Sequence, residues 1–328
     1  MNQFGYVYKN SIYGESHGKM VGIVIDGVPA GTKIDYDLLL NDLDRRKPGA
    51  IGTTKRSEAD EPVIYSGVYN GYATGAPLHI GFINSNTKSK DYSEFLKMPR
   101  PGHADFVANY KYNGFQDYNG GGHFSGRITL GLVSSGAIAK MFLPFKFSSK
   151  LVSVGTLTDM TKIDSYLEEI SLKGDSVGGV IEVSVSNMIK GLGEPFFDSC
   201  ESRISQMLFS VPAVKGVEFG LGFRGANVLG SSYNDMIIDK NGTTKTNNNG
   251  GINGGITNGN DLVIRVMIKP TPSIFMPQET YNFETNQMDT LQIKGRHDAC
   301  IARRALVVVE NAIAIALADL YLIREGRK

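Results

Sequence analysis

Residues 126–143 read GRITLGLVSSGAIAKMFL. Small and aliphatic side chains dominate this stretch, and the run SSGA at 134–137 would let another helix approach closely. We therefore expect a helix that is buried within the protein. A second apolar run, at 305–323, includes Glu310 and Asp319. It is expected to be a buried helix and not a membrane span, because charged side chains are rare inside a membrane.

The other regular patterns are those of strands, which are typical of short apolar or alternating runs bounded by turn residues. In LHIGFI at 78–83, Leu78, Ile80 and Phe82 take one face of the strand. His79 lies on the other face, which favours a structural role for this histidine. Strands are expected at 21–25, 62–66, 78–83, 180–185 and 262–268.

Helix ends are marked by capping residues. Asp35 is expected to cap a short helix that has two leucines on one face and ends before a Pro-Gly pair. Asp198 is expected to cap a helix that runs to about residue 209, and a turn is expected at 211–216. The cluster KGRHD at 294–298 is expected to open the C-terminal helix.

Composition limits the class of protein. With 328 residues and 41% hydrophobic content, the chain can form a large core, and because no linker-like break divides it we expect one domain over 1–328. A net charge of +1 argues against recruitment of nucleic acid or a membrane by bulk charge. Cys200 and Cys300 lack the spacing of a disulfide framework or zinc site, so no metal is expected. The first residues have no apolar signal core, which favours the cytoplasm.

Groups that can carry chemistry are concentrated in PRPGHADFVANYKYNGFQDYNGGGHFSGR at 99–127. The stretch holds His103 and His123 among several cations, and three glycines at 120–122 lead towards the apolar helix. A glycine-rich turn before a helix leaves backbone N–H groups free to face an anion, and histidines exchange protons near neutral pH. Two interpretations stand at this point: an anion-handling active site, or a tight turn that needs positive φ.

Cations also surround the loop that follows the first helix. Arg45, Arg46 and Lys47 end the helix, and Lys55 and Arg56 follow the loop. A solvated helix end would explain one or two of these cations through the helix dipole. Five cations around one glycine-containing loop favour an anion site.

Two further segments are candidates for ligand binding. Cations in KGRHD at 294–298 conflict with the dipole of a helix start, and such conflicts are typical of functional sites. The Asn/Gly-rich segment TNNNGGINGGITNGN at 246–260 is expected to be mobile and disordered without ligand. Together with KPTPS at 269–273, beyond the next strand, it is expected to wrap a phosphate-bearing ligand.

Taken together, these landmarks resemble the chorismate synthase family. Any one short motif could arise by chance, but the set follows the family's order over nearly the whole chain. The matching motifs are GESHG (14–18), DLDRR (42–46), SKDY (89–92), RPGHAD (100–105), GGG (120–122), GLGEP (191–195), AVKG (213–216), KPTPS (269–273) and GRHD (295–298).

The resemblance implies a fold and an activity. The fold is α+β, a single-domain β-α-β sandwich with a helical core between antiparallel sheets, and the assembly is a homotetramer. The activity is that of a carbon–oxygen lyase acting on phosphates, which converts 5-enolpyruvylshikimate 3-phosphate to chorismate and phosphate by 1,4-elimination in the last step of the shikimate pathway. The family needs reduced FMN although the reaction has no net redox change, and NADPH or an external flavin reductase is the expected source of electrons.

The resemblance also implies roles for individual residues. His103 would protonate the reduced flavin, His17 would act on the substrate or its leaving phosphate, and Asp298 would remove a proton by way of flavin N5. Because the substrate carries a phosphate and two carboxylates, paired guanidinium contacts are needed. The arginines implied at the substrate or NADPH are Arg45, Arg46, Arg100 and Arg127. The residues implied at FMN are His123, Phe124, Ser125, Pro212, Ala213, Gly254, Lys269, Pro270, Thr271, Pro272, Ser273 and Arg296.

Four features depart from the commonest family pattern. HFS at 123–125 stands where Arg-Ser-Ser is usual, and Arg127 is a partial substitute for the lost cation. The loop AIG at 50–52 lacks an arginine that many members carry, which argues against an NADPH contact there. Ala299 replaces the usual proline, and the segment 145–174 is abbreviated.

Other functions are compatible with the same residues. A flavin-dependent oxidoreductase would couple NADPH oxidation to reduction of a phosphorylated substrate. A non-catalytic flavin- or nucleotide-binding protein would give His17, His103 and Asp298 no reason to converge. RNA binding by the clustered cations is least favoured because of the charge balance.

Overall fold

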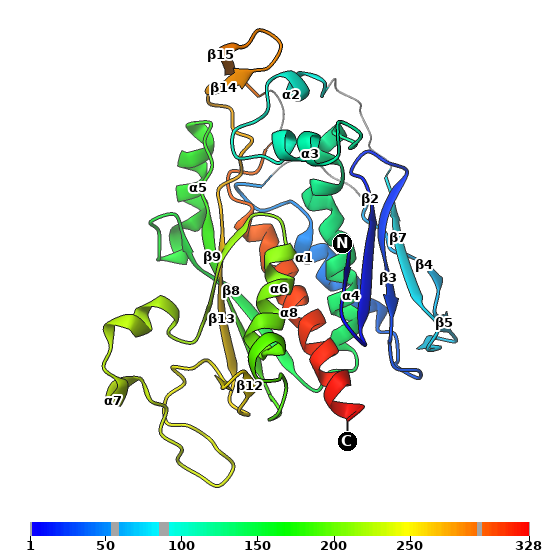
Figure 1. The fold of residues 1–328 in the computed structure, drawn as a ribbon, viewed down its shortest axis with the longest axis vertical. Helices are drawn as coiled ribbons and strands as arrows, with labels where there is room; N and C mark the ends of the chain where they lie inside the picture. Colours follow the sequence, from blue (N-terminus) through cyan, green and yellow to red (C-terminus); the bar gives the residue numbers. More distant parts are fainter. Residues whose placement is uncertain (1, 54–58, 85–91, 294–296, 328) are drawn as a thin grey trace.

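A five-stranded antiparallel sheet forms one outer layer of the molecule and lies on the right in Figure 1. The computed structural model describes residues 2–53, 59–84, 92–293 and 297–327. The strands of this sheet follow the order β1 (Gln3–Phe4), β2 (Lys9–Gly14), β3 (Met20–Asp26), β7 (Leu78–Ile83) and β4 (Val63–Ser66).

Side chains alternate along these strands as predicted. In β7, Leu78, Ile80 and Phe82 are completely buried in the core. His79 lies on the opposite face, where its Nε2 is 2.6 Å from the hydroxyl of Tyr13. His79 is therefore a structural residue of the outer face of the sheet.

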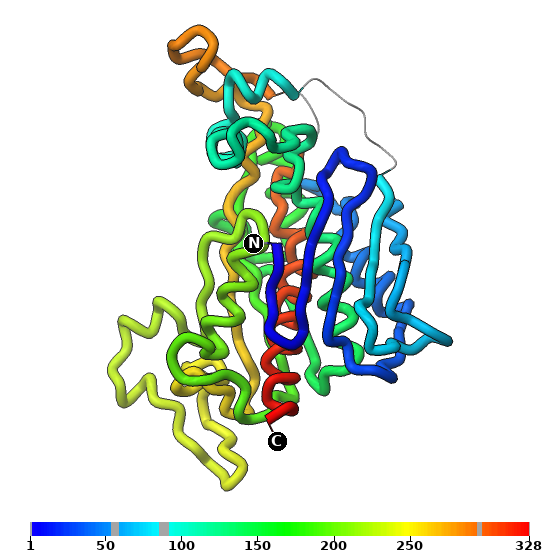
Figure 2. The backbone as a smooth tube through the Cα atoms, turned by 45° about the vertical axis from the view of Figure 1, so that its right-hand side comes forward, coloured from blue at the N-terminus to red at the C-terminus, as the bar shows by residue number. Residues whose placement is uncertain are grey.

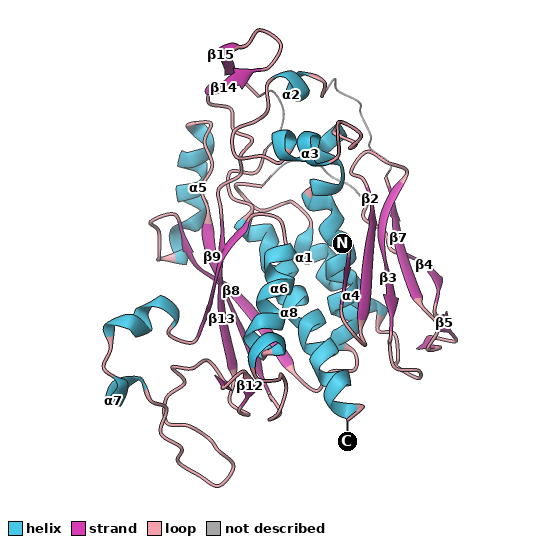
Figure 3. Ribbon diagram, in the orientation of Figure 1, coloured by secondary structure: helices cyan, strands magenta, loops and turns pink. Residues whose placement is uncertain are grey.

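A four-stranded antiparallel sheet forms the opposite layer, in the order β10 (Val214–Phe219), β13 (Leu262–Ile268), β9 (Gly179–Ser186) and β8 (Lys146–Val154). Helices fill the space between the two sheets (Figures 1 and 3). The main ones are α1 (Tyr36–Arg46), α4 (Thr129–Lys140), α6 (Cys200–Ser210) and α8 (Ala302–Glu325). The expected α+β sandwich with a helical core between antiparallel sheets is confirmed.

Helices α4 and α8 pack against each other in the middle of this layer. Every residue of 129–139 is buried. A Cβ added to Gly136 would overlap the backbone of Asn311, so the close approach depends on glycine at this position. Among the described residues, α8 is the one helix long and apolar enough to cross a membrane, but 78% of its apolar window is buried inside the protein. Both apolar runs of the sequence are core helices.

The remaining elements lie around this sandwich. At its upper end in Figure 1 are α2 (Glu94–Lys97), α3 (Asp105–Lys111), β14 (Gln278–Asn282) and β15 (Gln287–Leu291). The others are α5 (Ile163–Leu172), α7 (Gly230–Tyr233), β5 (Val68–Tyr69), β6 (Tyr72–Ala73), β11 (Ile252–Asn253) and β12 (Ile256–Thr257), with 3-10 turns at Asn119–Phe124, Gly126–Ile128, Met160–Lys162, Phe196–Asp198 and Gly222–Asn227.

The last helix anchors the first turn of the chain. Asp319 of α8 is fully buried, and its carboxylate accepts the backbone N–H groups of Tyr6, Val7 and Tyr8 at 2.8–3.0 Å. Arg203 of α6 forms an ion pair with the same carboxylate at 2.9 Å, which compensates the buried charge. The N-terminal hairpin accordingly runs beside the C-terminal helix in Figure 2.

The structure corrects three expected element boundaries. The cap of α6 is Ser199, whose hydroxyl accepts the N–H of Ser202 at 3.0 Å, whereas Asp198 accepts a hydrogen bond from the Tyr6 hydroxyl. The expected turn at 211–216 is shorter, because β10 begins at 214 and pairs with β13. Helix α8 begins at 302, which leaves 297–298 on the loop before it.

The Asn/Gly-rich segment 246–260 is structured, which contradicts the expected mobile loop. It contains the β11–β12 hairpin. The Asp235 carboxylate accepts the backbone N–H groups of Asn248 and Asn249 and the hydroxyl of Thr246 at 2.7–2.9 Å. Composition alone predicted disorder because it takes no account of such side-chain bonds to the backbone.

A cluster of four charged residues lies where α1, α4 and α8 meet; three of the side chains are buried, and that of Arg45 is 37% exposed. Glu310 accepts hydrogen bonds from Arg45 at 2.8 Å and from Lys140 at 2.5 Å. Asp42 pairs with the same two cations, each at 2.8 Å. Burial alone would raise the pKa of Glu310, but the hydrogen bonds from Arg45 and the charge of Lys140 outweigh it and lower the pKa to about 2.

The variant Glu310→Gln should lower the free energy of unfolding by about 2 kcal/mol at neutral pH, because the buried ammonium group of Lys140 loses one of its two carboxylate partners, whereas the partly exposed Arg45 contributes little. Since the pKa of Glu310 is lower in the folded state, its contribution is complete above about pH 4.5 and is lost as the pH falls towards 2. The difference between wild type and variant should shrink over that range. Denaturant unfolding at several pH values measures it.

The matched control is Glu284→Gln, which removes one partner of the exposed Lys97–Glu284 pair. It should change the free energy of unfolding by less than about 1 kcal/mol. Equal losses in the two variants would show that the buried cluster is not a major source of stability.

Candidate active site

The three glycines at 120–122 form a turn in which all three φ angles are positive, at 59°, 83° and 52°. Such angles favour glycine. Side chains would also not fit: a Cβ on Gly120 would overlap His17 Nε2, and one on Gly122 would overlap the carbonyl oxygen of Asp117. The turn therefore needs glycine both for its backbone and for the space it leaves.

Two histidines lie against consecutive glycines of this turn. His17 contacts Gly120, and the position of a Cβ on Gly121 is 3.8 Å from His103 Nε2. The N–H of Ser16 donates to the carbonyl of the third glycine at 3.1 Å, which fixes the 14–18 loop to the turn. The two interpretations of the glycines are thus compatible, because the tight turn is what brings the histidines together.

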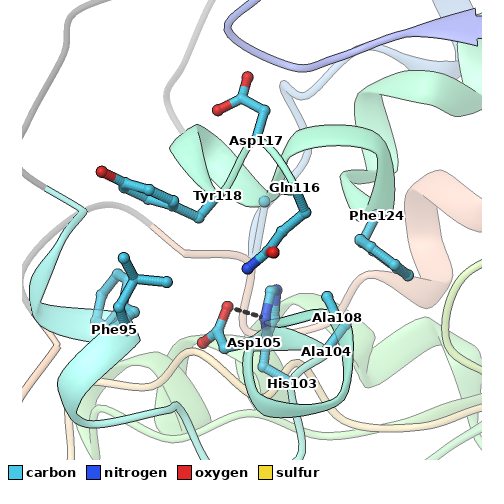
Figure 4. Close-up of a pocket in the computed structure, with 11 residues that line it drawn as sticks. Phe95, His103, Ala104, Asp105, Ala108, Gln116, Asp117, Tyr118 and Phe124 are labelled. Atoms are coloured by element: carbon cyan, nitrogen blue, oxygen red, sulfur yellow. Dashed lines mark ion pairs between the residues drawn. The ribbon is translucent and has the colours of Figure 1, made fainter. Parts of the chain in front are cut away.

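His103 belongs to a hydrogen-bonded group at the start of α3. Its Nδ1 lies 2.6 Å from Asp105 Oδ1 (Figure 4), and Arg100 donates to the two Asp105 oxygens at 2.7 and 2.8 Å. Arg100 also packs over the ring of Phe95 and donates to Ser273 Oγ at 3.2 Å. Burial alone would raise the pKa of Asp105, but hydrogen bonds from Arg100 and His103 hold it far below its ordinary value.

A pocket of about 310 Å³ opens beside this group (Figure 4). Its polar end contains His103, Asp105 and Gln116. Its apolar lining includes Phe95, Leu96, Ala104, Ala108 and Phe124. An apolar pocket with a few converging polar groups is typical of a small-molecule site.

Asp298 borders a second pocket, of about 290 Å³, together with Ser273, Phe275 and His297. Arg304 at the start of α8 donates to Asp298 Oδ2 at 3.1 Å. Ser273 lines this pocket and also accepts a hydrogen bond from Arg100, the arginine that holds Asp105, so these two residues link the group around His103 to the pocket of Asp298. His103 and Asp298 therefore face one region of the molecule.

Arg46 and Arg127 are buried on either side of Asp60 in the same region. Their Nη1 atoms lie 3.2 and 2.7 Å from the two Asp60 oxygens. Burial, together with the nearby cation of Arg304, lowers the pKa of Arg46 to about 9. Among the described residues, three arginines here face the carboxylates of Asp60 and Asp298. Guanidinium groups gathered in one place are well suited to bind carboxylate or phosphate groups.

Arg45 does not join this group. It is held by Asp42, Glu310 and the hydroxyl of Ser149 in the buried cluster described above. Its contacts therefore give no support to the predicted role in substrate binding. Three other cations of the sequence analysis, Lys55, Arg56 and Arg296, lie outside the described residues.

Two segments that are predicted to bind the cofactor, those of Ala213 and Lys269, meet beside the loop that carries His103. The N–H of Lys269 donates to the carbonyl of Ala213 at 2.9 Å, and its ammonium group donates to the carbonyl of Gly102 at 2.5 Å. Ala213 has a positive φ of 72°, which is rare for a residue with a Cβ and is typical of functional sites. The buried hydroxyl of Thr271 has no hydrogen-bond partner among the described residues.

The segment 123–125 is placed on the other side of the glycine turn. His123 Nδ1 lies 2.8 Å from the carbonyl oxygen of Gly14, and Phe124 lines the first pocket. Ser125 accepts the N–H of Arg127 at 3.3 Å. The commoner arginine is thus replaced by an imidazole that holds the loop bearing His17.

Gly254 is not brought to the other cofactor residues. It lies at the turn of the β11–β12 hairpin, which hydrogen-bonds to the residues just before β13. Lys269 follows the far end of β13, a strand of seven residues. At about 3.3 Å per residue, the strand that lies between the two positions is roughly 20 Å long.

Several residues of the site were not assigned a role from the sequence. Asp105 lies two positions after His103 in the RPGHAD motif, so its spacing was a usable signal. Arg304 is also close in sequence to the residue that it holds, Asp298. Asp60 has a left-handed φ of 49° and contacts arginines from two distant elements, which no sequence pattern revealed.

Histidines at a shared glycine turn, buried arginines and a carboxylate beside two pockets are typical of an enzyme that acts on a small molecule. A sequence model of the chorismate synthase family matches residues 8–322. The chain is 50% identical over 325 residues to a chorismate synthase of Chitinophaga pinensis, covering 99% of this chain and 98% of that protein. It is 43% identical over 349 residues to one of Pyrococcus abyssi, covering 98% and 97%.

A solved structure described as the crystal structure of chorismate synthase matches the fold with a TM-score of 0.77 and 27% identity, over 98% of this chain and 94% of that one. The chain belongs to the chorismate synthase family. It is accordingly an enzyme of the lyase class that acts at the last step of the shikimate pathway.

Replacing the first turn glycine tests the geometry of the site. Gly120→Ala should lower the rate of chorismate formation by about 100-fold or more, because the added methyl group displaces His17 and misplacement by about 1 Å is enough for such a loss. Gly126→Ala is the control, since a Cβ there meets open space and φ is not positive. Similar activities in the two variants would rule out the proposed dependence on the turn.

Proposed function

We propose that this enzyme eliminates phosphate from 5-enolpyruvylshikimate 3-phosphate in the 1,4 sense to give chorismate, with reduced FMN bound beside the substrate. His17 and His103 meet at one glycine turn beside the buried Arg46 and Arg127, and this meeting is the observation behind the proposal. A phosphate that leaves an allylic carbon as an anion needs a cationic setting and a proton donor. The family supplies the identity of the substrate.

We assign each residue of the site a role in the elimination. Arg46 and Arg127 bind anionic groups of the substrate and stabilise the charge that builds on the leaving phosphate. His17 gives a proton to that phosphate as the C–O bond breaks. Asp298, held by Arg304, takes up the proton that the substrate loses. One C–O bond and one C–H bond are broken and a double bond forms, so no net oxidation occurs.

The residues beside His103 suit a flavin mononucleotide. Lys269 offers a cation to the phosphate, and the hydroxyl of Thr271, buried and without a hydrogen-bond partner among the described residues, offers a contact to the same ligand. The apolar wall at Phe124 suits a ring system. Reduced FMN, when bound, supplies electron density that assists C–O cleavage without net redox change.

We place the enzyme in the cytoplasm, with NADPH or a separate flavin reductase as the source of electrons. The short loop at 50–52 supports a separate reductase. The carbonyl of Gly52 accepts the N–H groups of Ala299 and Cys300 at 2.8 and 3.2 Å. The loop therefore holds the segment that carries Asp298, and it lacks the arginine that would contact a nicotinamide cofactor.

We also propose a homotetramer in which a second chain completes the cofactor site. In one chain, β13 separates Gly254 from Lys269 by its whole length. The implied contact of Gly254 with FMN therefore requires the β11–β12 hairpin of another copy. Gly254 is suited to such a contact because a Cβ there would meet nothing within 4 Å in its own chain.

The function is tested by mixing the protein anaerobically with dithionite-reduced FMN and 5-enolpyruvylshikimate 3-phosphate. Chorismate and phosphate should appear in equal amounts without net oxidation of the flavin, and His17→Ala and His103→Ala should each lower the rate by about 100-fold or more. NADPH oxidation matched by substrate reduction would instead indicate an oxidoreductase. Flavin binding without either product would indicate a non-catalytic flavoprotein.

The shared site is tested by complementation between inactive variants. His103→Ala and Gly254→Glu should each be inactive, the second because a carboxylate would repel the cofactor phosphate. Refolding the two together should restore activity in assemblies that pair an intact His103 with an intact hairpin. Gly254→Asn, which tolerates positive φ without adding charge, is the control and should stay active. Mixed assemblies without activity would place Gly254 outside a shared site.

A further inference from the structure

The Asp105 carboxylate is an acceptor with every oxygen engaged. Its side chain is 8% exposed. One oxygen accepts the backbone N–H of Arg100 at 3.1 Å and Arg100 Nε at 2.7 Å, and the other accepts Arg100 Nη2 at 2.8 Å and lies next to His103. A carboxylate surrounded by guanidinium donors is ionised, so it has no proton to give.

The 2.6 Å separation of Asp105 Oδ1 and His103 Nδ1 therefore requires a proton on Nδ1. Two acceptor atoms at that distance would repel each other, whereas an N–H donor forms a short, charge-assisted hydrogen bond. Arg100 Nη2 lies 3.1 Å from the same ring nitrogen. Arg100 Nη2 already donates to Asp105 Oδ1, so this nitrogen and the Nδ1–H group of His103 donate to the same oxygen.

The other ring nitrogen of His103 faces the glycine turn. A Cβ on Gly121 would lie 3.8 Å from His103 Nε2, and both residues line the first pocket. In a neutral imidazole with Nδ1 protonated, Nε2 carries the lone pair and is the basic atom. When the ring is charged, Nε2–H is the group directed at the pocket.

We propose that Asp105 is the positioning residue of His103, fixing the ring proton on Nδ1 so that Nε2 is the atom that exchanges protons with the ligand. Arg100, which the family resemblance implies at the substrate, serves as the anchor of Asp105 with its Nε and Nη2. Carboxylates orient catalytic and metal-bound histidines in the same way in other proteins. The expected effect on kcat rests on the proposed function, whereas the expected protonation of His103 on Nδ1 does not depend on it.

The wild-type protein gives the first test. Magic-angle-spinning NMR of protein labelled with ¹⁵N in the histidine rings distinguishes protonated from unprotonated nitrogens, and the spectrum of His103→Gln assigns the signals. At a pH where the ring is neutral, His103 should show a protonated Nδ1 and an unprotonated Nε2. The opposite tautomer in the wild type would overturn the proposal, whatever the variants do.

Asp105→Asn gives the second test. The amide has one acceptor oxygen, and the backbone N–H and Nε of Arg100 both donate to it. The NH₂ group then faces His103 Nδ1, which favours the tautomer of His103 that is protonated on Nε2. We expect that change in the spectrum and a kcat about 100-fold lower, with KM near the wild-type value. Asp105→Glu keeps a carboxylate and should restore the wild-type tautomer and part of kcat.

The control is Asp164→Asn, which removes an exposed partner of Arg303 outside the site and should leave tautomer and kcat unchanged. Should Asp105→Asn fail to fold, the wild-type spectrum and the Asp105→Glu variant still test whether Asp105 positions the ring of His103. An active wild type whose Asp105→Asn variant keeps both tautomer and kcat would overturn the positioning role. A protein with the expected tautomers that forms no chorismate would overturn the proposed function and leave the positioning of the ring intact.

Discussion

The contact between α4 and α8 at Gly136 and Asn311 is the constraint on which the arrangement of the molecule depends. The outer sheets lie on this pair, since β3 contacts α4 while β8 and β9 contact α8. Each helix also begins beside a part of the site: α4 follows the glycine turn, and α8 follows Asp298. Packing the two helices therefore brings these parts of the site together.

Arg46 shows how closely the two helix starts meet. Its Nε donates to the hydroxyl of Thr129, the first residue of α4, and its carbonyl accepts from Arg304 in the first turn of α8. Two helix N-termini therefore point their positive ends at one region that already holds buried arginines. An anion there is favoured by the dipoles of the two helices as well as by side chains. The contribution of the dipoles follows from the fold alone.

The sequence predicted the core more completely than the site. Apolar periodicity located both central helices and the buried strands, because burial leaves a direct mark on residue type. Arg45 and Arg46 show where this reasoning fails. They are equivalent in the sequence, yet a rotation of about 100° along the helix sends one into the ion cluster and the other to the site. Family resemblance named His17, His103 and Asp298, while the roles of their neighbours Asp105 and Arg304, and of Asp60, were assigned from three-dimensional contacts.

The carboxylate of Asp319 links the two ends of the chain, and this has a consequence for biosynthesis. The N–H groups of residues 6–8 have no partner of this kind until residue 319 has left the ribosome. Helix α8, which fills the middle of the sandwich, is likewise made after the strands of both sheets. Helix α4 and the strands β8 and β9, which all contact α8, therefore keep an apolar face uncovered until residues 302–325 have been made. Uncovered apolar surface favours aggregation, so the core is protected only once α8 has packed against these elements.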